Sequence, residues 1–436
     1  MKPSGIEWIG DIPDDWEVTK ISRLYSIQLG KMLQPEKKSS GDTYEPYICA
    51  ANLSSGTFRL DEVKYMWISE PEKDIYRLKR DDLLVTEGGD VGISSIWKDD
   101  ISPCYFQNAL HRVVPKKGNS NRFLHYWLIV LKSVGYIDLI CNKSTIAHFT
   151  KEKFAQSLIL SIPLQTQQRI ADYLDEKCGE IDATIAKQKE SIEKLKAYKQ
   201  SLISETVTKG LDKSAPLKPS GIDYLGDIPA HWEVKRIKEL FSFGKGLPIS
   251  KEDLIENGIP VINYGQIHSK DNNGTSIKDS LIRYVDLNYK NTNMTSLVES
   301  GDFIFADTSE DLDGCGNCIY VDSKYPIFAG YHCIILRSIK RNSSKYLAYL
   351  FQMDAWRTQI RRDVTGVKVF SISKKILGKS YILFPPRYEQ ECIVNYLQEK
   401  CNEIDVIINK KQNIIQKLDA YKKSLIFECV TGKQKI

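Results

Sequence analysis

The chain lacks several features that would place it in a common class of protein. No apolar run reaches the roughly 18 residues that a membrane-spanning helix requires, so we expect no membrane partner. The opening MKPSGIEWIGD contains no apolar core of a secretory signal, and the ten cysteines are scattered through 436 residues. We therefore expect reduced thiols and a cytoplasmic location.

Signatures of catalysis are also missing. FPPRYEQ, which begins at Phe384, lacks the acidic or amide residue that precedes the prolines of an NPPY-like tetrapeptide, so we interpret it as a strand-to-helix boundary. TEGGDVG, from Thr86, has no strand–GxGxxG–helix unit around it, and we interpret it as a turn. We find no Walker loop, nuclease carboxylate cluster or catalytic triad, which favours a protein without catalytic activity of its own.

Two short patterns resemble metal sites, but the spacing of each argues against one. Cys315 and Cys318 form a CxxC, and His332 and Cys333 follow, yet no second pair stands at zinc-finger spacing. The acidic segment from Ser309 matches the first positions of a calcium loop but has Tyr where a bidentate Glu is needed. We interpret the cysteines as reduced, and we predict no metal.

His111 and His332 fall at matching places on predicted strands in the two halves of the chain. The sequence places no acid or nucleophile near either of them. We therefore expect both histidines to be hydrogen-bonded and structural rather than catalytic.

The chain does contain an internal repeat that covers its full length. KPSGIEWIGDIP, from Lys2, recurs 216 residues later as KPSGIDYLGDIP, and the WEV from Trp16 recurs as the WEV from Trp232. A second block, QRIADYLDEKCGEID from Gln168, recurs 223 residues later as ECIVNYLQEKCNEID. The formal net charge of +5 permits a polyanionic partner but does not by itself identify one.

The stretches between these blocks, roughly residues 20–160 and 236–384, match each other far less. Both contain short β-branched and aromatic runs bounded by turn residues, which predict strands; examples are DDLLVTEGG, NALHRVVP, GDFIFADTSED and GYHCIILR. Each also contains one helical segment, NRFLHYWLIVLKSVGYIDLI or SKYLAYLFQMDAWRTQIRR. We predict an α+β protein of two α/β domains and two helical spacers, with boundaries at 1–162, 163–213, 214–385 and 386–436.

The second repeated block predicts a long helix in each half. Hydrophobic residues recur at 4-3 spacing through both copies, the a/d pattern of a coiled coil. The predicted helix-pairing residues are Leu174, Ile181, Ile185, Ile192, Leu195, Leu202, Leu397, Ile404, Ile408, Ile415, Leu418 and Leu425. Start and stop signals are Pro163 and Pro386, then Gly210 and Gly432. Polar residues interrupt the seam, so packing of each helix on its own domain remains an alternative.

Connectivity constrains how two paired helices can run. The first helix leads from domain 1 to domain 2, and the second leads away from domain 2. If both domains stay close to the helices, the pair must be antiparallel, with a domain at each end and the chain termini as neighbours. The seam from Ile181 to Leu202 would span about 32 Å at about 1.5 Å per residue. One turn of B-DNA is roughly 34 Å, so two domains at this spacing could contact two half-sites on one face of a duplex.

Two groups of motifs carry a resemblance to a known family. The first is the box GIEWIGDIPDDWEV, repeated as GIDYLGDIPAHWEV, and the second is the pair of helix openings IPLQTQQRIADYLDEKCGEID and PPRYEQECIVNYLQEKCNEID. Over essentially its full length the chain resembles the specificity subunits of type I restriction–modification systems. GKGLPISKEDLIENGIPVINYGQI resembles the start of a recognition domain in this family, whereas GKMLQPEKKSSGDTYEPYICAANL departs from it, with Met32 where Gly246 stands.

The resemblance implies a function and a set of partners. Each of the two target-recognition domains would read one half of a bipartite, asymmetric site in double-stranded DNA. The helical spacers would set the half-site distance and dock two methyltransferase subunits, and restriction (motor) subunits would complete the complex. The chain itself would bind no cofactor; S-adenosylmethionine, ATP and Mg²⁺ are expected in the partner subunits.

Polar and basic loops of the two domains are the candidates for contact with DNA, because such side chains contact phosphates and base edges. The predicted DNA-binding residues are Lys31, Lys37, Lys38, Asn108, Lys143, Ser144 and Thr145 in domain 1, and Lys245, Lys251, Asn263, Gln266, Arg361, Arg362 and Lys368 in domain 2. The late loops CNKSTIAHF and VTGVKVFSIS are the favoured pair.

Two other functions are compatible with the same patterns. One is a coiled-coil protein–protein scaffold that never binds DNA. The other is a fused nuclease or methyltransferase, which the missing catalytic motifs disfavour. The sequence does not reveal the target that a DNA-binding protein of this kind would read.

Overall fold

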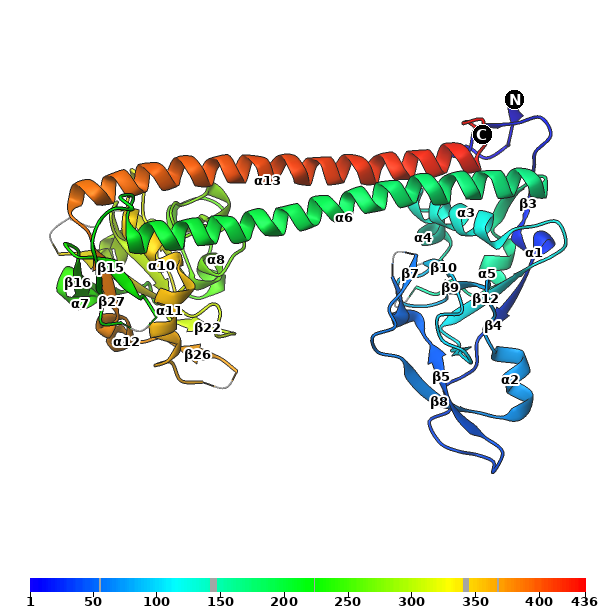
Figure 1. Cartoon of the computed structure of the whole chain (residues 1–436), viewed down its shortest axis with the longest axis horizontal. Coiled ribbons are helices and arrows are strands. Elements are labelled where there is room, and N and C mark those ends of the chain that lie inside the picture. The colour runs from blue at the N-terminus through cyan, green and yellow to red at the C-terminus, as the bar shows by residue number, and fades with distance from the viewer. Residues whose placement is uncertain (55, 142–146, 223, 340–344, 367) are drawn as a thin grey trace. The chain divides into compact units, whose positions relative to one another are not determined.

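The computed structural model describes residues 1–436 except 55, 142–146, 223, 340–344 and 367 (Figure 1). The chain forms two compact units: unit 1 comprises Met1–Lys189 and Lys411–Ile436, and unit 2 comprises Glu190–Lys410. Each unit therefore contains one α/β domain and about half of each long helix. Within the described residues, no helix is long and apolar enough to cross a membrane.

The two long helices start and stop where the sequence predicts. α6 spans Leu164–Lys209 and α13 spans Arg387–Val430, each beginning directly after a proline. Proline is tolerated there because the first turn of a helix has no intrahelical partner for its N–H groups. Gly210 and Gly432 follow the two helices with φ of 72° and 73°, the left-handed conformation that ends a helix at little cost for glycine.

Unit 1 is built around a four-stranded antiparallel sheet. Its strands, in spatial order, are β10 (Ser94–Ile96), β9 (Leu83–Thr86), β12 (Leu110–Pro115) and β4 (Tyr25–Leu29). A second sheet contains β11 (Tyr105–Phe106), β5 (Thr43–Ile48) and β8 (Lys64–Ile68). β3 (Glu17–Lys20) pairs with β13 (Leu158–Ser161), and β6 (Leu53–Ser54) with β7 (Thr57–Phe58). The shorter helices are α1 (Ile21–Leu24), α2 (Glu70–Tyr76), α3 (Asn121–Ser133), α4 (Tyr136–Ile140) and α5 (Lys151–Gln156).

Unit 2 has a four-stranded sheet in which equivalent strands have the same neighbours, so that β17 takes the place of β4 and β23 the place of β10. Its strands are β17 (Phe241–Lys245), β25 (Cys333–Ser338), β21 (Phe303–Ala306) and β23 (Cys318–Tyr320). A second sheet contains β19 (Arg283–Val285), β18 (Ile259–Ile262), β24 (Ile327–Ala329) and β20 (Leu297–Val298). β16 (Glu233–Arg236) pairs with β27 (Tyr381–Phe384), and β22 (Thr308–Ser309) with β26 (Phe370–Ser371). The shorter helices are α7 (Ile237–Leu240), α8 (Tyr264–Ile267), α9 (Tyr289–Thr292), α10 (Lys345–Gln352), α11 (Asp354–Arg361) and α12 (Lys374–Lys379).

The prediction of one helical segment in each domain is wrong in a similar way in both units. In unit 1 the segment breaks between α3 and α4 at Gly135, whose φ of 74° lies in the left-handed region. In unit 2 it breaks between α10 and α11 at Met353, whose φ of −68° and ψ of 131° are extended. Both halves of each segment are apolar on one face, so the hydrophobic pattern continues across the break and does not reveal it.

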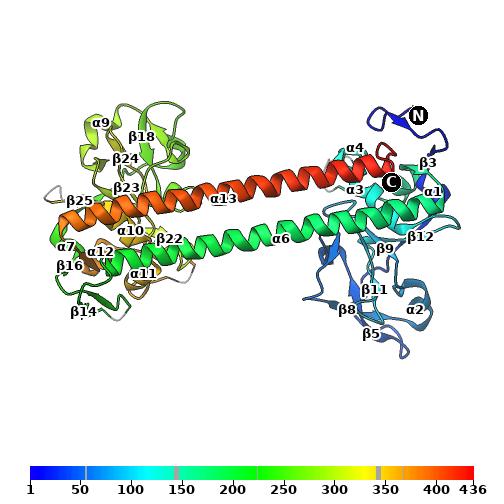
Figure 2. The same cartoon turned by 45° about the horizontal axis from the view of Figure 1, so that its top comes forward.

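The N-terminal box of unit 1 packs on the end of α13. Trp16 joins Ile426 and Val430 in one buried cluster, and β1 (Lys2–Pro3) pairs with β2 (Asp11–Ile12) above it. The Lys433 ammonium group donates hydrogen bonds to backbone carbonyls in the box. The predicted proximity of the two chain termini is therefore confirmed within unit 1, where Figure 2 shows them side by side.

The second copy of the box occupies the same place in unit 2, on the end of α6. Trp232 joins Ile203 and Val207 in a buried cluster, and β14 (Leu217–Pro219) pairs with β15 (Asp227–Pro229). The repeat is therefore cyclic: the box that follows α6 along the chain in unit 2 corresponds to the N-terminal box that packs against α13 in unit 1. The N-terminal sequence therefore occurs twice because the end of each long helix packs against one copy of it.

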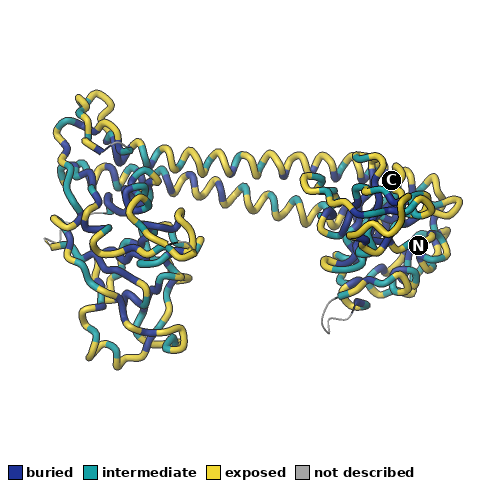
Figure 3. The backbone as a smooth tube through the Cα atoms, turned by 90° about the horizontal axis from the view of Figure 1, so that it is seen from below, coloured by how far each residue is buried: buried dark blue, intermediate teal, exposed yellow. Residues whose placement is uncertain are grey.

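Within each unit the two long helices pair antiparallel. In unit 1, Lys422 lies 2.6 Å from Asp182, and Lys411 donates a 3.0 Å hydrogen bond to Gln188, so the numbering falls on α13 as it rises on α6. In unit 2, Lys199 and Asp405 form the equivalent ion pair at 2.7 Å. Figure 3 shows that burial is concentrated in the α/β part of each unit and that the long helices are exposed over much of their surface.

The seam residues proposed from the sequence face inward along these helices. Buried members are Leu174, Ile181, Ile185, Ile192, Leu397, Ile404, Ile408 and Leu425. Half-buried members are Leu195, Leu202, Ile415 and Leu418.

Candidate nucleic-acid interface

A glycine marks the point where the first strand of each main sheet gives way to its loop. The N–H of Gly30 donates to the Leu110 carbonyl, and the N–H of Gly246 donates to the Cys333 carbonyl, each at 3.0 Å. A Cβ on either glycine would overlap a backbone carbonyl group of the adjacent segment, so only glycine fits. Gly30, not Met32, is therefore the structural equivalent of Gly246. The prediction that this segment departs from the family pattern by having Met32 in place of Gly246 is wrong.

The hydrogen bonds also correct the expected match between two histidines. His111 lies in β12 and corresponds to Ile334, whereas His332 lies in a turn before β25 with φ of 53°. His111 is fully buried, and its Nε2 is 2.8 Å from the Phe149 carbonyl oxygen, which confirms a structural role. His332 is half exposed and is not on a strand, because the register places β25 one residue later.

An acidic residue follows the central strand of each main sheet and contacts a histidine. In unit 1, Glu87 Oε1 lies 3.1 Å from His148 Nδ1, and in unit 2, Asp307 Oδ1 lies 3.1 Å from His332 Nδ1. The two acids are equivalent, because the backbone N–H and C=O groups of each form hydrogen bonds at the same point of its sheet. The histidines, however, come from different segments of the two units. The framework is thus shared by the units, while the side chains placed on it differ.

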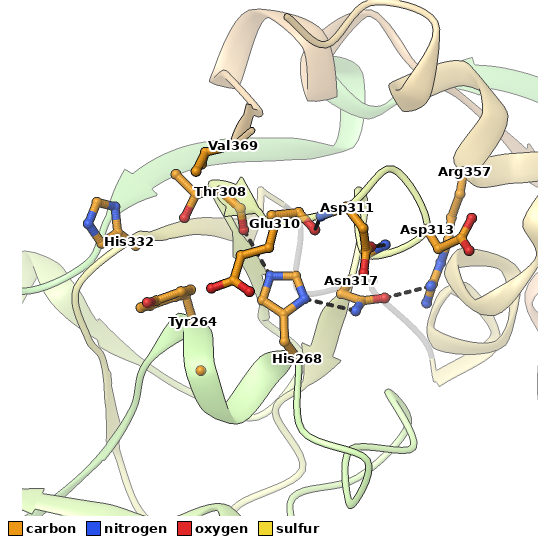
Figure 4. Close-up of a pocket in the computed structure, with 13 residues that line it drawn as sticks. Tyr264, His268, Thr308, Glu310, Asp311, Asp313, Asn317, His332, Arg357 and Val369 are labelled. Carbon is orange, nitrogen blue, oxygen red and sulfur yellow. Dashed lines mark hydrogen bonds between the residues drawn. The ribbon is translucent and has the colours of Figure 1, made fainter. Parts of the chain in front are cut away.

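The loop after this strand is longer in unit 2 and forms a pocket. Residues 307–317 join β21 to β23, four more than residues 87–93 between β9 and β10 (11 against 7). The pocket has a volume of about 670 Å³. Its lining residues are Tyr264, Gly265, His268, Thr308, Ser309, Glu310, Asp311, Asp313, Gly314, Asn317, His332, Arg357 and Val369 (Figure 4).

A chain of hydrogen bonds fixes one side of the pocket. Arg357 donates to Asn317 Oδ1 at 2.5 Å, and the Asn317 amide lies 3.0 Å from His268 Nδ1. His268 Nε2 is 2.8 Å from the Thr308 carbonyl oxygen, so this nitrogen carries the proton and Nδ1 accepts. Both ring nitrogens are therefore already used, and the ring is held in one orientation.

Two other polar groups in the pocket, the Glu310 carboxylate and the Tyr264 hydroxyl, are free to form hydrogen bonds with a ligand. Figure 4 shows the Glu310 carboxylate between the rings of His268 and Tyr264. Among the residues that the structure describes, no hydrogen bond or ion pair involves this carboxylate or the Tyr264 hydroxyl. Asp311 differs, because its Oδ1 accepts the N–H of Gly314 at 2.6 Å and closes the loop. The pocket can thus accept hydrogen bonds from a ligand at Glu310.

The cysteines near this loop are buried thiols. Burial raises the pKa of Cys318 to about 12 and also raises the pKa of Cys315, so both are protonated at neutral pH. In the described part of the chain, no three His, Cys, Asp or Glu side chains are grouped as metal ligands would be.

The structure separates the predicted DNA-binding residues by exposure. Exposed are Lys37, Lys38, Lys245, Lys251, Arg362 and Lys368; half-buried are Asn108, Gln266 and Arg361; buried are Lys31 and Asn263. Lys143, Ser144 and Thr145 lie outside the described residues. Lys368 adjoins Val369 of the pocket, whereas the exposed lysines of unit 1 lie in a loop before β5.

Two of these residues are poorly placed to meet a polyanion. Lys31 is 6% exposed, and its ammonium group forms an ion pair with Glu72 at 2.5 Å and a 3.0 Å hydrogen bond to Gln34. Asn263 is 1% exposed and lies beside Gly330. Sequence alone could not separate them from exposed residues, because their burial depends on contacts with distant segments.

The sequence reasoning missed two features of these surfaces. One is Glu310 with Tyr264, which no motif brings together. The other is an exposed aromatic face of unit 1, in which the Tyr44 ring lies 5.6 Å from Tyr65 and 5.2 Å from Trp67, and Lys37 lies 5.2 Å from the Trp67 ring. The alternation of aromatic residues along KYMW was the available signal for this face.

Comparisons with known proteins agree on one family. The profile of the type I restriction modification DNA specificity domain matches residues 13–196 and 229–417. The type I restriction enzyme MjaVIII specificity subunit of Methanocaldococcus jannaschii is 22% identical over 98% of this chain and 94% of its own length. The EcoKI specificity subunit of Escherichia coli K12 is 21% identical over 97% of this chain and 90% of its own length.

Solved structures share the fold. A chain described in work on complex assembly and conformational transition of the type I R-M system superposes with a TM-score of 0.70 at 14% identity, covering 96% of this chain and 98% of that chain. The HsdS subunit from Thermoanaerobacter tengcongensis gives a TM-score of 0.51 at 14% identity, covering 97% of this chain and 98% of its own.

These matches extend over far more than half of the chain and include both copies of the repeat. The chain therefore belongs to the family of type I restriction modification DNA specificity domains, whose full-length members are the non-catalytic specificity subunits of these systems.

Proposed function

We propose that the α/β domain of each unit reads one half of a bipartite, asymmetric DNA site. The observation that carries this proposal is the combination of a shared framework with different loops. The two main sheets have the same strand order, a glycine at the same place before the first loop and an acidic residue, Glu87 or Asp307, after the central strand. The loops that follow differ in length and in side chains, as two readers of different half-sequences require.

Exposed cations on these loops support contact with DNA. Lys37 and Lys38 lie on unit 1, and Arg362 and Lys368 lie on unit 2, the latter beside the pocket. Phosphate contacts of this kind supply most of the sequence-independent affinity for a duplex. Half-site specificity would come from side chains that reach base edges in the major groove.

The long helices have two roles in this proposal. Their antiparallel pairing sets the distance between half-sites, and their exposed surfaces dock two methyltransferase subunits. S-adenosylmethionine would be bound by those subunits, and ATP and Mg²⁺ would be used by the restriction subunits. The curated relatives are named as specificity subunits of type I restriction enzymes, which agrees with such an assembly.

The direct test maps methylated positions in the genome of cells that express the chain with its methyltransferase subunits. A split motif with two fixed halves and an unspecified gap is the expected result. Exchanging residues 236–384 for the corresponding segment of another family member should change one half only. A change in both halves, or methylation without a split motif, would contradict the proposal.

Salt dependence separates DNA recognition from a protein–protein scaffold. For a subunit that contacts phosphates, the logarithm of the binding constant should fall linearly with the logarithm of salt concentration, with a slope of about −0.9 per phosphate neutralised. The assembled complex should show this behaviour on a duplex that carries the mapped motif. A scaffold would show no affinity for the duplex at any salt concentration.

A further inference from the structure

The pocket of unit 2 has a composition that is unusual for a surface that meets DNA. Glu310, Asp311 and Asp313 all line it, although DNA carries a negative charge at every phosphate. Carboxylates at such a surface repel the backbone, so they need a partner that donates hydrogen bonds. Base edges in the major groove provide such donors.

Among the described residues, neither the Glu310 nor the Asp313 carboxylate has a hydrogen bond, and the two differ in their place in the pocket. Asp311 is bound to the backbone of its own loop, and Asp313 lies on the side of the pocket formed by Arg357 (Figure 4). Glu310 instead lies between Tyr264 and His268, and the described residues offer its carboxylate no hydrogen bond. An ionised carboxylate is an acceptor without a donor, so the group that it binds must carry N–H or O–H.

The neighbours of Glu310 are fixed in a way that suits recognition. Both nitrogens of His268 are bonded within the protein, which removes this ring as a competing donor. Gly314 allows the loop to lie against the same ring, because a Cβ there would crowd Ser309 Oγ and His268. The acceptor is therefore presented on a loop whose base is held by hydrogen bonds.

Among the base edges of the major groove, two carry amino groups: N4 of cytosine and N6 of adenine. In adenine the amino group stands next to the N7 acceptor, whose lone pair would face the second oxygen of a carboxylate. Cytosine has a C–H group at the corresponding place, which an apolar neighbour such as Val369 tolerates. A pocket that offers a carboxylate acceptor and an apolar side chain therefore fits cytosine better than adenine.

Two exposed lysines lie near a strand that pairs with the pocket loop. β22, which begins the pocket loop, pairs with β26, and the exposed Lys368 and Lys374 flank that strand in sequence. Exposed lysines of this kind can contact the phosphates of a bound duplex.

From these contacts we infer that Glu310 reads the N4 amino group of a cytosine in the half-site bound by unit 2. This inference rests on the proposed DNA-recognition function and deepens it to one residue and one base.

The test uses the full chain with its methyltransferase subunits, expressed in cells whose methylated motifs are then mapped. The half-site assigned to unit 2, by exchange of residues 236–384, should contain a fixed C·G pair for the native chain. With Glu310→Gln, an amide that both donates and accepts, preference for C·G at that position should fall by about ten- to hundredfold. The other half-site should be unchanged.

Two further variants make the result decisive. Glu310→Ala removes the acceptor and should relax the same position without favouring another base. Glu256→Gln removes an exposed carboxylate outside the pocket lining and should leave the motif as it is. Thermal unfolding of each variant checks that the unit is intact.

Failure of the Glu310 assignment and failure of DNA recognition give different results. If the motif is split but its unit 2 half contains no C·G pair, or if Glu310→Gln leaves every position unchanged, the assignment of Glu310 is wrong while DNA recognition stands. If no split motif is methylated by the native complex, the proposed function itself fails.

Discussion

Gln188 on α6 and Lys411 on α13 are joined by a 3.0 Å hydrogen bond, and each occupies the position of the other in the repeat, 223 residues apart. The neighbouring ion pairs follow the same rule: Asp182 with Lys422 becomes Asp405 with Lys199 when the two copies are interchanged. Equivalent residues thus meet equivalent partners, so the two ends of the helix pair should respond alike to matched mutations.

The first prediction concerns these ion pairs. Lys199→Ala and Lys422→Ala should each lower the free energy of unfolding by less than about 1 kcal/mol, because both pairs are partly exposed and screened by water. Urea unfolding with double-mutant cycles, using Asp405→Ala and Asp182→Ala, measures each coupling. Couplings that differ from each other by more than the experimental error would show that the two ends are not equivalent.

The second prediction concerns the glycines at the start of the loops. Gly30→Ala and Gly246→Ala should each destabilise the protein by about 1–3 kcal/mol, since the added methyl group overlaps a backbone carbonyl, which must shift to make room. Gly41→Ala is the control, because a Cβ at Gly41 meets nothing within 4 Å. Thermal melting of the three variants checks the ranking, and an equal effect at Gly41 would remove the steric explanation.

The third prediction concerns pH. Burial lowers the pKa of His111 below its ordinary value of 6.5, although the hydrogen bond to the Phe149 carbonyl opposes this shift. The second ring nitrogen, Nδ1, is buried without a partner in the described structure, so protonation there is unfavourable. Because the unfolded chain binds this proton more readily than the folded one, stability should fall as pH drops below about 6.5.

The same experiment isolates the contribution of that histidine. His111→Gln, which can still donate to the Phe149 carbonyl but cannot become charged, should weaken the dependence of stability on pH between pH 7 and 5. His148→Gln serves as the control, since that ring is half exposed beside Glu87. Urea unfolding at the two pH values gives the slopes, and an unchanged slope for His111→Gln would rule out this residue as the cause.

The fourth prediction separates exposed from buried lysines. Lys368→Ala should weaken duplex binding of the assembled complex to all sequences alike and reduce the steepness of its salt dependence by about one unit. Lys324→Ala, an exposed lysine outside the Glu310 pocket, is the control. Lys31→Met should instead lower stability, because it leaves Glu72 without its ion pair. A large loss of binding for a stable Lys31→Met variant would contradict this division.

The repeat itself shows how much of the fold could be derived from the residues. The limits of α6 and α13 followed from Pro163 and Gly210 and their counterparts, because helix ends depend on local backbone chemistry. The antiparallel pairing followed from connectivity. The breaks at Gly135 and Met353 were missed, because the apolar face of a helix can continue across a break.

What the sequence determined by itself was therefore the class of fold, the cyclic repeat, the helices and the family, all of which depend on spacing and on short-range backbone preferences. Only the tertiary structure decided which side chains are exposed. Lys31 is buried by Glu72, 41 residues away, and His268 is held by Thr308, 40 residues away. Contacts of that range depend on how strands and loops close around one another, and no local pattern records them.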